Sequence, residues 1–210
     1  MKKKKFYITT TIAPTLFFFK GQPRLWKERF DVCAIAGEKE RLKVFAEEEG
    51  ICYKYMAIHR EISLLSDFVC LFQFIWLFIK DRPYIVHGNT PKASMLSMVA
   101  AWLTRRPVRI YMCHGLRYQS AVGMTRKLLM FFEKLTCCCA NRVLCVSNGV
   151  KGQLVDDGLC KMDKVKVILH GTAGGIDTRY FSRNSEMGGG SFISSQQSLC
   201  VYFCRAISTR

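Results

Sequence analysis

The chain has 210 residues, which is enough for one well-packed core or for one domain and a fragment. Half of its residues are hydrophobic, which excludes a wholly disordered or low-complexity chain. Its 32 Lys and Arg residues outnumber 16 Asp and Glu residues, and this net charge of +16 favours an anionic partner such as nucleic acid, an acidic membrane leaflet or a phosphorylated substrate. A basic solvated surface without a specific partner is the alternative.

Short runs of β-branched and aromatic residues alternate along the chain with longer helical patterns. The predicted strands are residues 6–12, 31–36, 52–58, 84–87, 108–113, 142–146 and 164–169. The predicted helices are residues 38–50, 64–79, 92–105, 126–140 and 148–157. This order predicts an α/β fold, a Rossmann-like, doubly wound parallel sheet with helices on both faces.

Two apolar segments have a second interpretation. Residues 1–19 have the basic head and apolar run of a signal peptide, but Pro14 interrupts the run and no small-residue cleavage site follows, so we favour a first strand. Residues 64–79 are apolar nearly all round and too short to span a bilayer, which takes about 20 apolar residues. They form either a buried core helix or a helix whose outer side meets a membrane surface.

The 11 cysteines include no C-x-x-C pair, and no Cys/His cluster has the spacing of a zinc site. Many of them, including Cys33, Cys70 and Cys145, lie inside apolar runs, where cysteine behaves as a small hydrophobic residue. Cysteine usage therefore predicts a reduced, cytosolic protein.

Ligands of open α/β sheets bind beyond the carboxyl ends of the strands, and polar residues and glycines gather at these positions here. Such residues can offer a bound phosphate or sugar three things: hydrogen bonds from backbone amides, positive charge, and room to approach the backbone closely. The substrate-binding candidates are Thr11, Lys20, Gly21, Gln22, His87, Asn89, Thr90, Lys92, Gly115, Arg117 and Ser147, and the catalytic candidate is His114.

Each candidate also has a structural interpretation. Glycines at strand ends are ordinary turn residues, and we expect Gly115 to let the chain turn after His114. A lone histidine such as His87 is more often structural than catalytic. Neither the G-x-G-x-x-G fingerprint nor the G-x-x-x-x-G-K-[ST] phosphate loop is present, which argues against NAD enzymes and NTPases.

Three segments, residues 84–120, 133–159 and 164–181, together resemble the N-terminal domain of bacterial family 4 glycosyltransferases, especially those of capsular and exopolysaccharide gene sets. The likeness covers about residues 3–182. It implies the GT-B architecture, in which two Rossmann-like domains enclose a cleft. In that family the N-terminal domain binds the acceptor, usually a lipid-linked sugar at the membrane. The C-terminal domain binds the nucleotide-sugar donor, usually without a required metal.

The resemblance also implies roles for single residues. His114 corresponds to the family histidine that reaches the donor sugar and the reacting centre, and Gly21 to the glycine near the donor phosphates. The "GGID" at residues 174–177 stands where the family has "NGID". The family's donor-binding domain is missing, so we expect residues 1–182 to be the acceptor-binding domain. Residues 183–210 are then a disordered linker and a stub left by truncation or a frameshift.

The expected function is therefore a glycosyltransferase, or its acceptor-binding half, that is inactive alone and needs no metal or other cofactor. Its expected partners are a nucleotide sugar, a lipid-linked or polysaccharide acceptor, an anionic membrane surface and a separately encoded C-terminal domain. Its expected location is the cytoplasm, peripheral at the inner face of the membrane. The alternative is a non-catalytic, membrane-associated module that binds a partner. Nucleic-acid binding is disfavoured, because the aromatic residues lie in apolar runs rather than among Lys and Arg.

Overall fold

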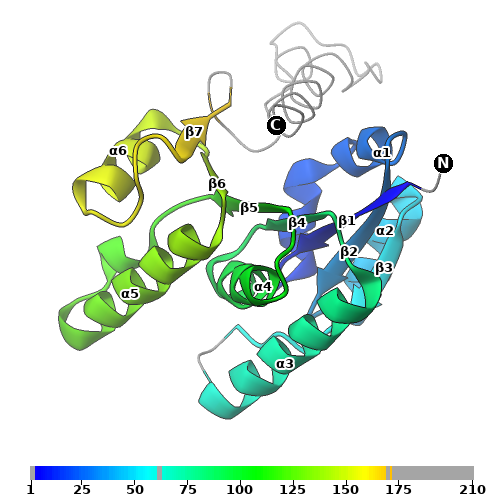
Figure 1. Cartoon of the computed structure of the whole chain (residues 1–210), viewed down its shortest axis with the longest axis horizontal. Coiled ribbons are helices and arrows are strands. Elements are labelled where there is room, and N and C mark those ends of the chain that lie inside the picture. The colour runs from blue at the N-terminus through cyan, green and yellow to red at the C-terminus, as the bar shows by residue number, and fades with distance from the viewer. Residues whose placement is uncertain (1–2, 61–62, 169–170, 172–210) are drawn as a thin grey trace, which may run out of the picture.

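The computed structural model describes residues 3–60, 63–168 and 171, and a parallel sheet crosses its centre (Figure 1). The strands lie in the order β3-β2-β1-β4-β5-β6-β7, and every neighbouring pair is parallel. The strands are β1 (Lys4–Thr9), β2 (Phe30–Ala36), β3 (Cys52–Tyr55), β4 (Ile85–Gly88), β5 (Val108–Cys113), β6 (Arg142–Cys145) and β7 (Val165–Val167). The predicted Rossmann-like α/β fold is confirmed.

Helical elements separate the strands along the chain. The α-helices are α1 (Gln22–Trp26), α2 (Lys39–Glu49), α3 (Leu64–Asp81), α4 (Pro91–Leu103), α5 (Gly123–Cys139) and α6 (Asn148–Asp156), and the 3-10 helices are η1 (Ala13–Phe19) and η2 (Arg117–Ser120). Of these, η1 and α1 have no counterpart among the predicted elements. Both begin beside a proline, Pro14 and Pro23, whose ring presets the helical φ angle at the first turn.

Two strands end three residues earlier than predicted. β1 ends at Thr9 rather than at residue 12, and β3 ends at Tyr55 rather than at residue 58. The amide of Thr10 still bonds to Ile35 O, but the amide of Thr11 donates to the hydroxyl of Thr90 instead of to a strand. The chain therefore leaves the sheet two residues after β1, where a hydrogen bond to a polar side chain takes the place of the hydrogen bonds between strands.

The side chains of the sheet form two separate cores because neighbouring residues of a strand point to opposite faces. Tyr7 packs into the core under α3, α4, α5 and α6, whereas Phe6 and Ile8 pack under η1, α1 and α2. Figure 1 shows α4 between α3 and α5 on the first of these faces. The hydrophobic runs without alternation, such as Val32–Ala36 in β2, follow from this burial on both faces.

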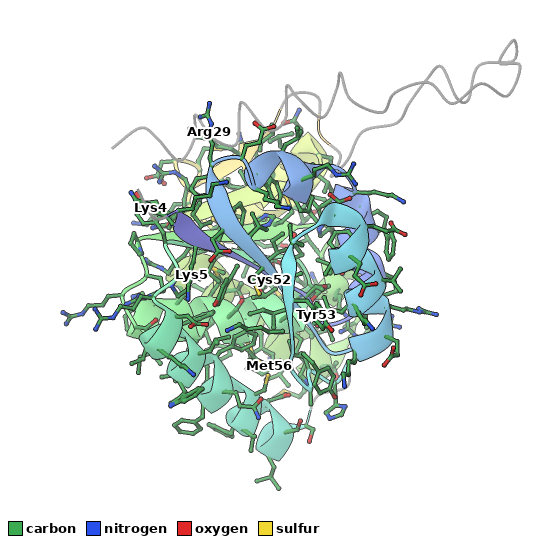
Figure 2. The ribbon with its side chains drawn as sticks, turned by 90° about the vertical axis from the view of Figure 1, so that its right-hand side faces the viewer. Lys4, Lys5, Arg29, Cys52, Tyr53 and Met56 are labelled. Carbon is green, nitrogen blue, oxygen red and sulfur yellow. The ribbon has the colours of Figure 1, made fainter. Side chains whose placement is uncertain are left out.

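At the β3 edge of the sheet, where Figure 2 labels Lys5 of β1 and Cys52 and Tyr53 of β3, one carboxylate joins three elements. Asp81, the last residue of α3, forms ion pairs with Lys5 of β1 (3.1 Å) and Lys54 of β3 (2.5 Å). The hydroxyl of Tyr7 donates a hydrogen bond to the same carboxylate. Burial raises the pKa of Asp81, but the hydrogen bonds from Lys54, Tyr7 and Lys5 outweigh it and hold that pKa well below its ordinary value.

Helix α3 has an apolar outer face. Its residues Cys70, Phe74 and Phe78 are buried against the sheet and α4. Six other large apolar residues are more than half exposed, and they recur at helical spacing: Leu65, Phe68, Val69, Phe72, Trp76 and Ile79. The interpretation of residues 64–79 as a buried core helix is therefore wrong.

Candidate functional site

Most of the predicted site residues gather at the carboxyl ends of β1, β4 and β5. The direction of strand order reverses between β1 and β4, since β2 and β3 lie on one side of β1 and β4 to β7 on the other. In open α/β sheets this reversal leaves a crevice in which ligands bind. Thr11 follows β1, Asn89 and Thr90 follow β4, and His114 follows β5.

Thr11, Thr90 and Asn89 tie the ends of β1 and β4 together. The amide of Thr11 donates to Thr90 Oγ1 (2.8 Å), and the two threonine hydroxyls lie 2.8 Å apart. The side-chain amide of Asn89 donates weakly to the carbonyls of Thr9 and His87, at 3.4 Å each. Its Oδ1 is buried and accepts no hydrogen bond from the described residues. This acceptor can take a donor from a ligand that enters the crevice.

His114 lies directly after β5 and is half-buried against η1. Its ring centroid is 6.0 Å from that of Phe18 and 5.8 Å from that of Phe19. Burial lowers its pKa, so the imidazole is neutral near pH 7. Its Nε2 has no hydrogen-bond partner within the described part of the chain. A neutral imidazole nitrogen can donate or accept a hydrogen bond, and the Nε2 of His114 is buried with that capacity unused.

The glycine after His114 is not required by the backbone. A Cβ at Gly115 meets no atom within 4 Å, and its φ lies outside the left-handed region. The prediction that Gly115 lets the chain turn is wrong, because the chain turns into η2 with ordinary φ angles. The open space around a Cβ at Gly115 also shows that no close packing requires a glycine there.

The other histidine of the prediction lies in the core. His87 is 1% exposed, and its ring packs against those of Phe6, Phe19 and Trp26 at centroid distances of 6.2, 5.7 and 6.1 Å. Burial, with a smaller contribution from His114, lowers its pKa to about 3. Phe19 therefore packs against both histidine rings.

The loop with Lys20, Gly21 and Gln22 is held by two glutamates that the sequence did not single out. The buried carboxylate of Glu49 accepts from the amide of Gly21 (2.8 Å) and from that of Arg24 (3.3 Å). Lys20 pairs with Glu48 (3.0 Å), and Gln22 is buried. Gly21 has a φ of 85°, a conformation that favours glycine. The Gly21 amide is thus engaged by Glu49 rather than presented to the crevice.

Three further candidates have separate environments. Ser147 accepts from the amide of Val150 (3.2 Å) and caps the N-terminus of α6. Lys92 and Arg117 line a groove of about 260 Å³ between α3, α4 and α5, where Lys92 pairs with Asp67 (2.6 Å). The sequence did not predict this groove, because its walls come from three helices that are separated along the chain. The predicted hinge at residues 174–177 and the segment 183–210 lie outside the described residues.

Comparison with known proteins identifies the family. Residues 23–173 match the sequence model of Glycosyltransferase Family 4. The chain belongs to glycosyltransferase family 4. The resemblance inferred from the sequence is therefore confirmed.

Two curated relatives of this family 4 chain support the assignment. The capsular polysaccharide biosynthesis glycosyltransferase CapM of Staphylococcus aureus is 31% identical over 182 residues, which are 86% of this chain and 47% of CapM. The UDP-Gal:alpha-D-GlcNAc-diphosphoundecaprenol alpha-1,3-galactosyltransferase of Escherichia coli is 26% identical over 145 residues, 69% of this chain and 38% of that enzyme. The chain thus spans less than half the length of either relative.

Among solved structures, Anabaena HepE in complex with UDP superposes on this family 4 chain with a TM-score of 0.61. The match covers 80% of this chain and 44% of HepE. At 15% sequence identity this likeness shows a shared fold only. Among the helices in the described ranges, none is both long and apolar enough for a transmembrane span.

Proposed function

We propose that this chain is the acceptor-binding half of a glycosyltransferase that moves a sugar from a nucleotide-sugar donor to a lipid-linked or polysaccharide acceptor. The observation that carries the proposal is the family 4 match over residues 23–173, which includes Asn89, Thr90 and His114. The printed names of the two relatives, one in capsular polysaccharide biosynthesis and one with a diphosphoundecaprenol acceptor, support this class of reaction.

In this proposal His114 holds the donor sugar and stabilises charge that develops during transfer. The bond from the sugar to the diphosphate breaks, so negative charge grows on the leaving group and positive character on the sugar carbon. A neutral imidazole whose buried Nε2 makes no hydrogen bond within the described residues supplies a polar contact without first having to lose a proton. Backbone amides and cations, with a second domain on the other side of the crevice, stabilise the diphosphate. No metal or other cofactor is required.

We also place the chain at the cytoplasmic face of an anionic membrane. The outer face of α3 carries Phe72 and Trp76, which are 66% and 64% exposed, and α5 carries Phe131, which is 59% exposed. Exposed aromatic stripes of this size are typical of surfaces that enter the interface of a bilayer. The net charge of +16 adds attraction to anionic lipids.

The proposal is tested by transfer assays with and without a donor-binding half. The purified chain alone, given UDP-sugars and a lipid-linked acceptor, is expected to release no UDP above the buffer background. The chain mixed with the separately expressed C-terminal half of CapM is expected to transfer sugar. Clear turnover by the chain alone contradicts its role as one half of an enzyme.

His114→Ala provides the matched control in the mixture. Loss of transfer supports the role of His114. If the variant transfers sugar as the wild type does, His114 has no role in the transfer. If neither mixture transfers sugar, the chain serves as a non-catalytic, membrane-associated module, which is the alternative function. Co-purification of a donor-binding protein with the wild-type chain then identifies the partner.

A further inference from the structure

The groove between α3, α4 and α5 is apolar inside. Its walls include Leu71 of α3, Leu96 and Val99 of α4, and Leu129 and Phe132 of α5. Its volume of about 260 Å³ lies near the lower end of the range for ligand pockets, about 300–1,000 Å³. It lies on the face of the sheet opposite η1 and the Glu49 carboxylate. The groove is therefore separate from the crevice at His114.

The mouth of this groove is basic. Lys92 lies in the first turn of α4, Arg60 precedes α3, and Arg117 lies in η2 after β5, so three cations from three elements converge there. Arg60 and Arg117 are exposed, while Lys92 is paired with Asp67. The cations thus outnumber the one carboxylate at the mouth. Because α4 begins just after β4 and η2 just after β5, the mouth lies at the same sheet edge as His114.

One other acidic residue, Glu133, lies on the wall of the groove. Its carboxyl is buried and accepts a hydrogen bond from the hydroxyl of Tyr111 (2.7 Å). Burial raises its pKa to about 7, so it carries only part of a negative charge near neutral pH. The interior of the groove therefore stays compatible with a hydrocarbon.

We propose that this groove binds the hydrocarbon chain of the lipid-linked acceptor next to its head group, with the phosphate of the same lipid at Arg60, Lys92 and Arg117. The inference rests on the proposed function, since it assigns the lipid part of that acceptor to a site. An apolar channel with cations at one end matches a molecule whose long chain is joined directly to an anion. A nucleotide sugar has no chain to fill the channel.

The groove is continuous with the apolar outer face of α3. Phe68 lines the groove and is also 59% exposed on the stripe that includes Phe72 and Trp76. A lipid chain can therefore pass from the bilayer into the groove along an apolar surface. The small volume holds only the segment nearest the phosphate, and the rest of the chain stays in the bilayer.

The proposal is tested by calorimetric titration of the 210-residue chain with alkyl phosphates of increasing length, below their micelle concentrations. Each buried methylene is expected to raise affinity about fourfold until the groove is full, after which affinity levels off. Inorganic phosphate is expected to bind far more weakly than decyl phosphate. Equal affinity for all chain lengths, or a rise with no plateau, overturns the groove as the site.

Variants separate the groove from the rest of the surface. Val99→Trp fills the channel and is expected to weaken decyl phosphate binding at least tenfold while leaving inorganic phosphate unchanged. Val44→Trp makes the same substitution at an exposed position of α2, on the other face of the sheet, and is expected to change neither. Arg117→Gln is expected to weaken all alkyl phosphates by the same factor. Unchanged decyl phosphate binding by a folded Val99→Trp protein contradicts the proposal.

A second measurement needs no variant. Decyl phosphate with a photoreactive diazirine near the end of its chain is expected to label peptides of α3, α4 and α5, and labelling confined to other elements overturns the proposal. These binding results are independent of transfer. Groove binding without transfer in the mixed assay leaves the lipid site standing and rejects the proposed enzyme. Transfer without groove binding supports the proposed enzyme and rejects the lipid site.

Discussion

His114 and His87 show how burial separates two histidines that both come at the end of a strand. Phe19 packs against both rings, but His114 is half-buried whereas His87 is 1% exposed and also packs against Phe6 and Trp26. Both have lowered pKa values because burial disfavours the charged imidazolium. His87 thus serves packing, and His114 remains the candidate for ligand binding.

Substitution of His114 is expected to lower activity, whereas substitution of His87 is expected to lower stability. His114→Ala in the mixture with a donor-binding half is expected to lower kcat by about 10²-fold or more, the usual cost of losing one polar group that stabilises developing charge, with little change in Tm. His87→Ala is expected to lower the free energy of unfolding by about 2–4 kcal/mol, because it leaves a cavity among aromatic rings. Steady-state kinetics and thermal melting of both variants check this, and equal losses of stability would contradict it.

Glu133 predicts a specific pH dependence of stability. Its raised pKa of about 7 means that the folded protein keeps a proton which the unfolded chain releases near the usual 4.5. The free energy of unfolding therefore falls as pH rises from 4.5 to 7, by at most on the order of 3 kcal/mol, and levels off above 7. Glu133→Gln, which keeps an acceptor for Tyr111, is expected to lack this fall.

Denaturant titrations of both proteins across this pH range provide the measurement. The difference in the free energy of unfolding between wild type and variant cancels the contributions of other groups. These include His87 and His114, whose lowered pKa values make stability rise with pH. A wild-type curve parallel to that of the variant would show that Glu133 ionises normally.

At the scale of elements, α3 has one face that packs into the core and an opposite face that is apolar and exposed. Cys70, Phe74 and Phe78 anchor it to the core, and Asp81 at its end pairs with Lys5 and Lys54. Because these contacts hold the helix in place, its outer face is not needed for packing and can be apolar. The hydropathy of the segment predicted a helix, but not which residues would face the solvent.

Removing the outer aromatic residues of α3 is expected to weaken membrane binding without unfolding the protein. Phe72→Ser combined with Trp76→Ser is expected to lower partitioning into anionic vesicles by about tenfold or more, because two large apolar side chains no longer enter the bilayer. Val44→Ser on α2 is the matched control and is expected to change nothing. Vesicle sedimentation measures the bound fraction, and equal binding by the double variant would exclude α3 as the contact.

At the scale of the whole molecule, charge and apolar surface act over different distances. In the proposed membrane association, the net charge of +16 supplies long-range attraction to an anionic bilayer, and the exposed faces of α3 and α5 act only on contact. Binding to anionic vesicles is expected to fall steeply as salt rises from about 0.01 M to about 1 M, because the Debye length shrinks from about 30 Å to about 3 Å.

Vesicles of zwitterionic lipid provide the comparison. They are expected to bind the chain weakly and with little dependence on salt, because only the apolar contact remains. DNA is expected to bind less tightly than anionic vesicles at the same ionic strength. Tighter binding to DNA would revive nucleic-acid binding as the role of the basic charge.

The sequence by itself determined the α/β class, the order of the strands along the chain and the position of His114 at a strand end, because these follow from hydrophobic periodicity and covalent order. It also carried the family 4 motifs. The sequence-based prediction failed at local features. Helix η1 lies in a run that is as apolar as a strand, α1 has only five residues, and the need for Gly115 was inferred from residue type alone.

Only the tertiary structure decided what each strand-end residue contacts. Glu49 binds the Gly21 amide from 28 residues away, and Phe19 packs against both His87 and His114. The groove exists because α3, α4 and α5 pack on one face of the sheet and bring Arg60, Lys92 and Arg117 to its mouth. Such contacts join residues far apart in the chain, and no local pattern of residues encodes them.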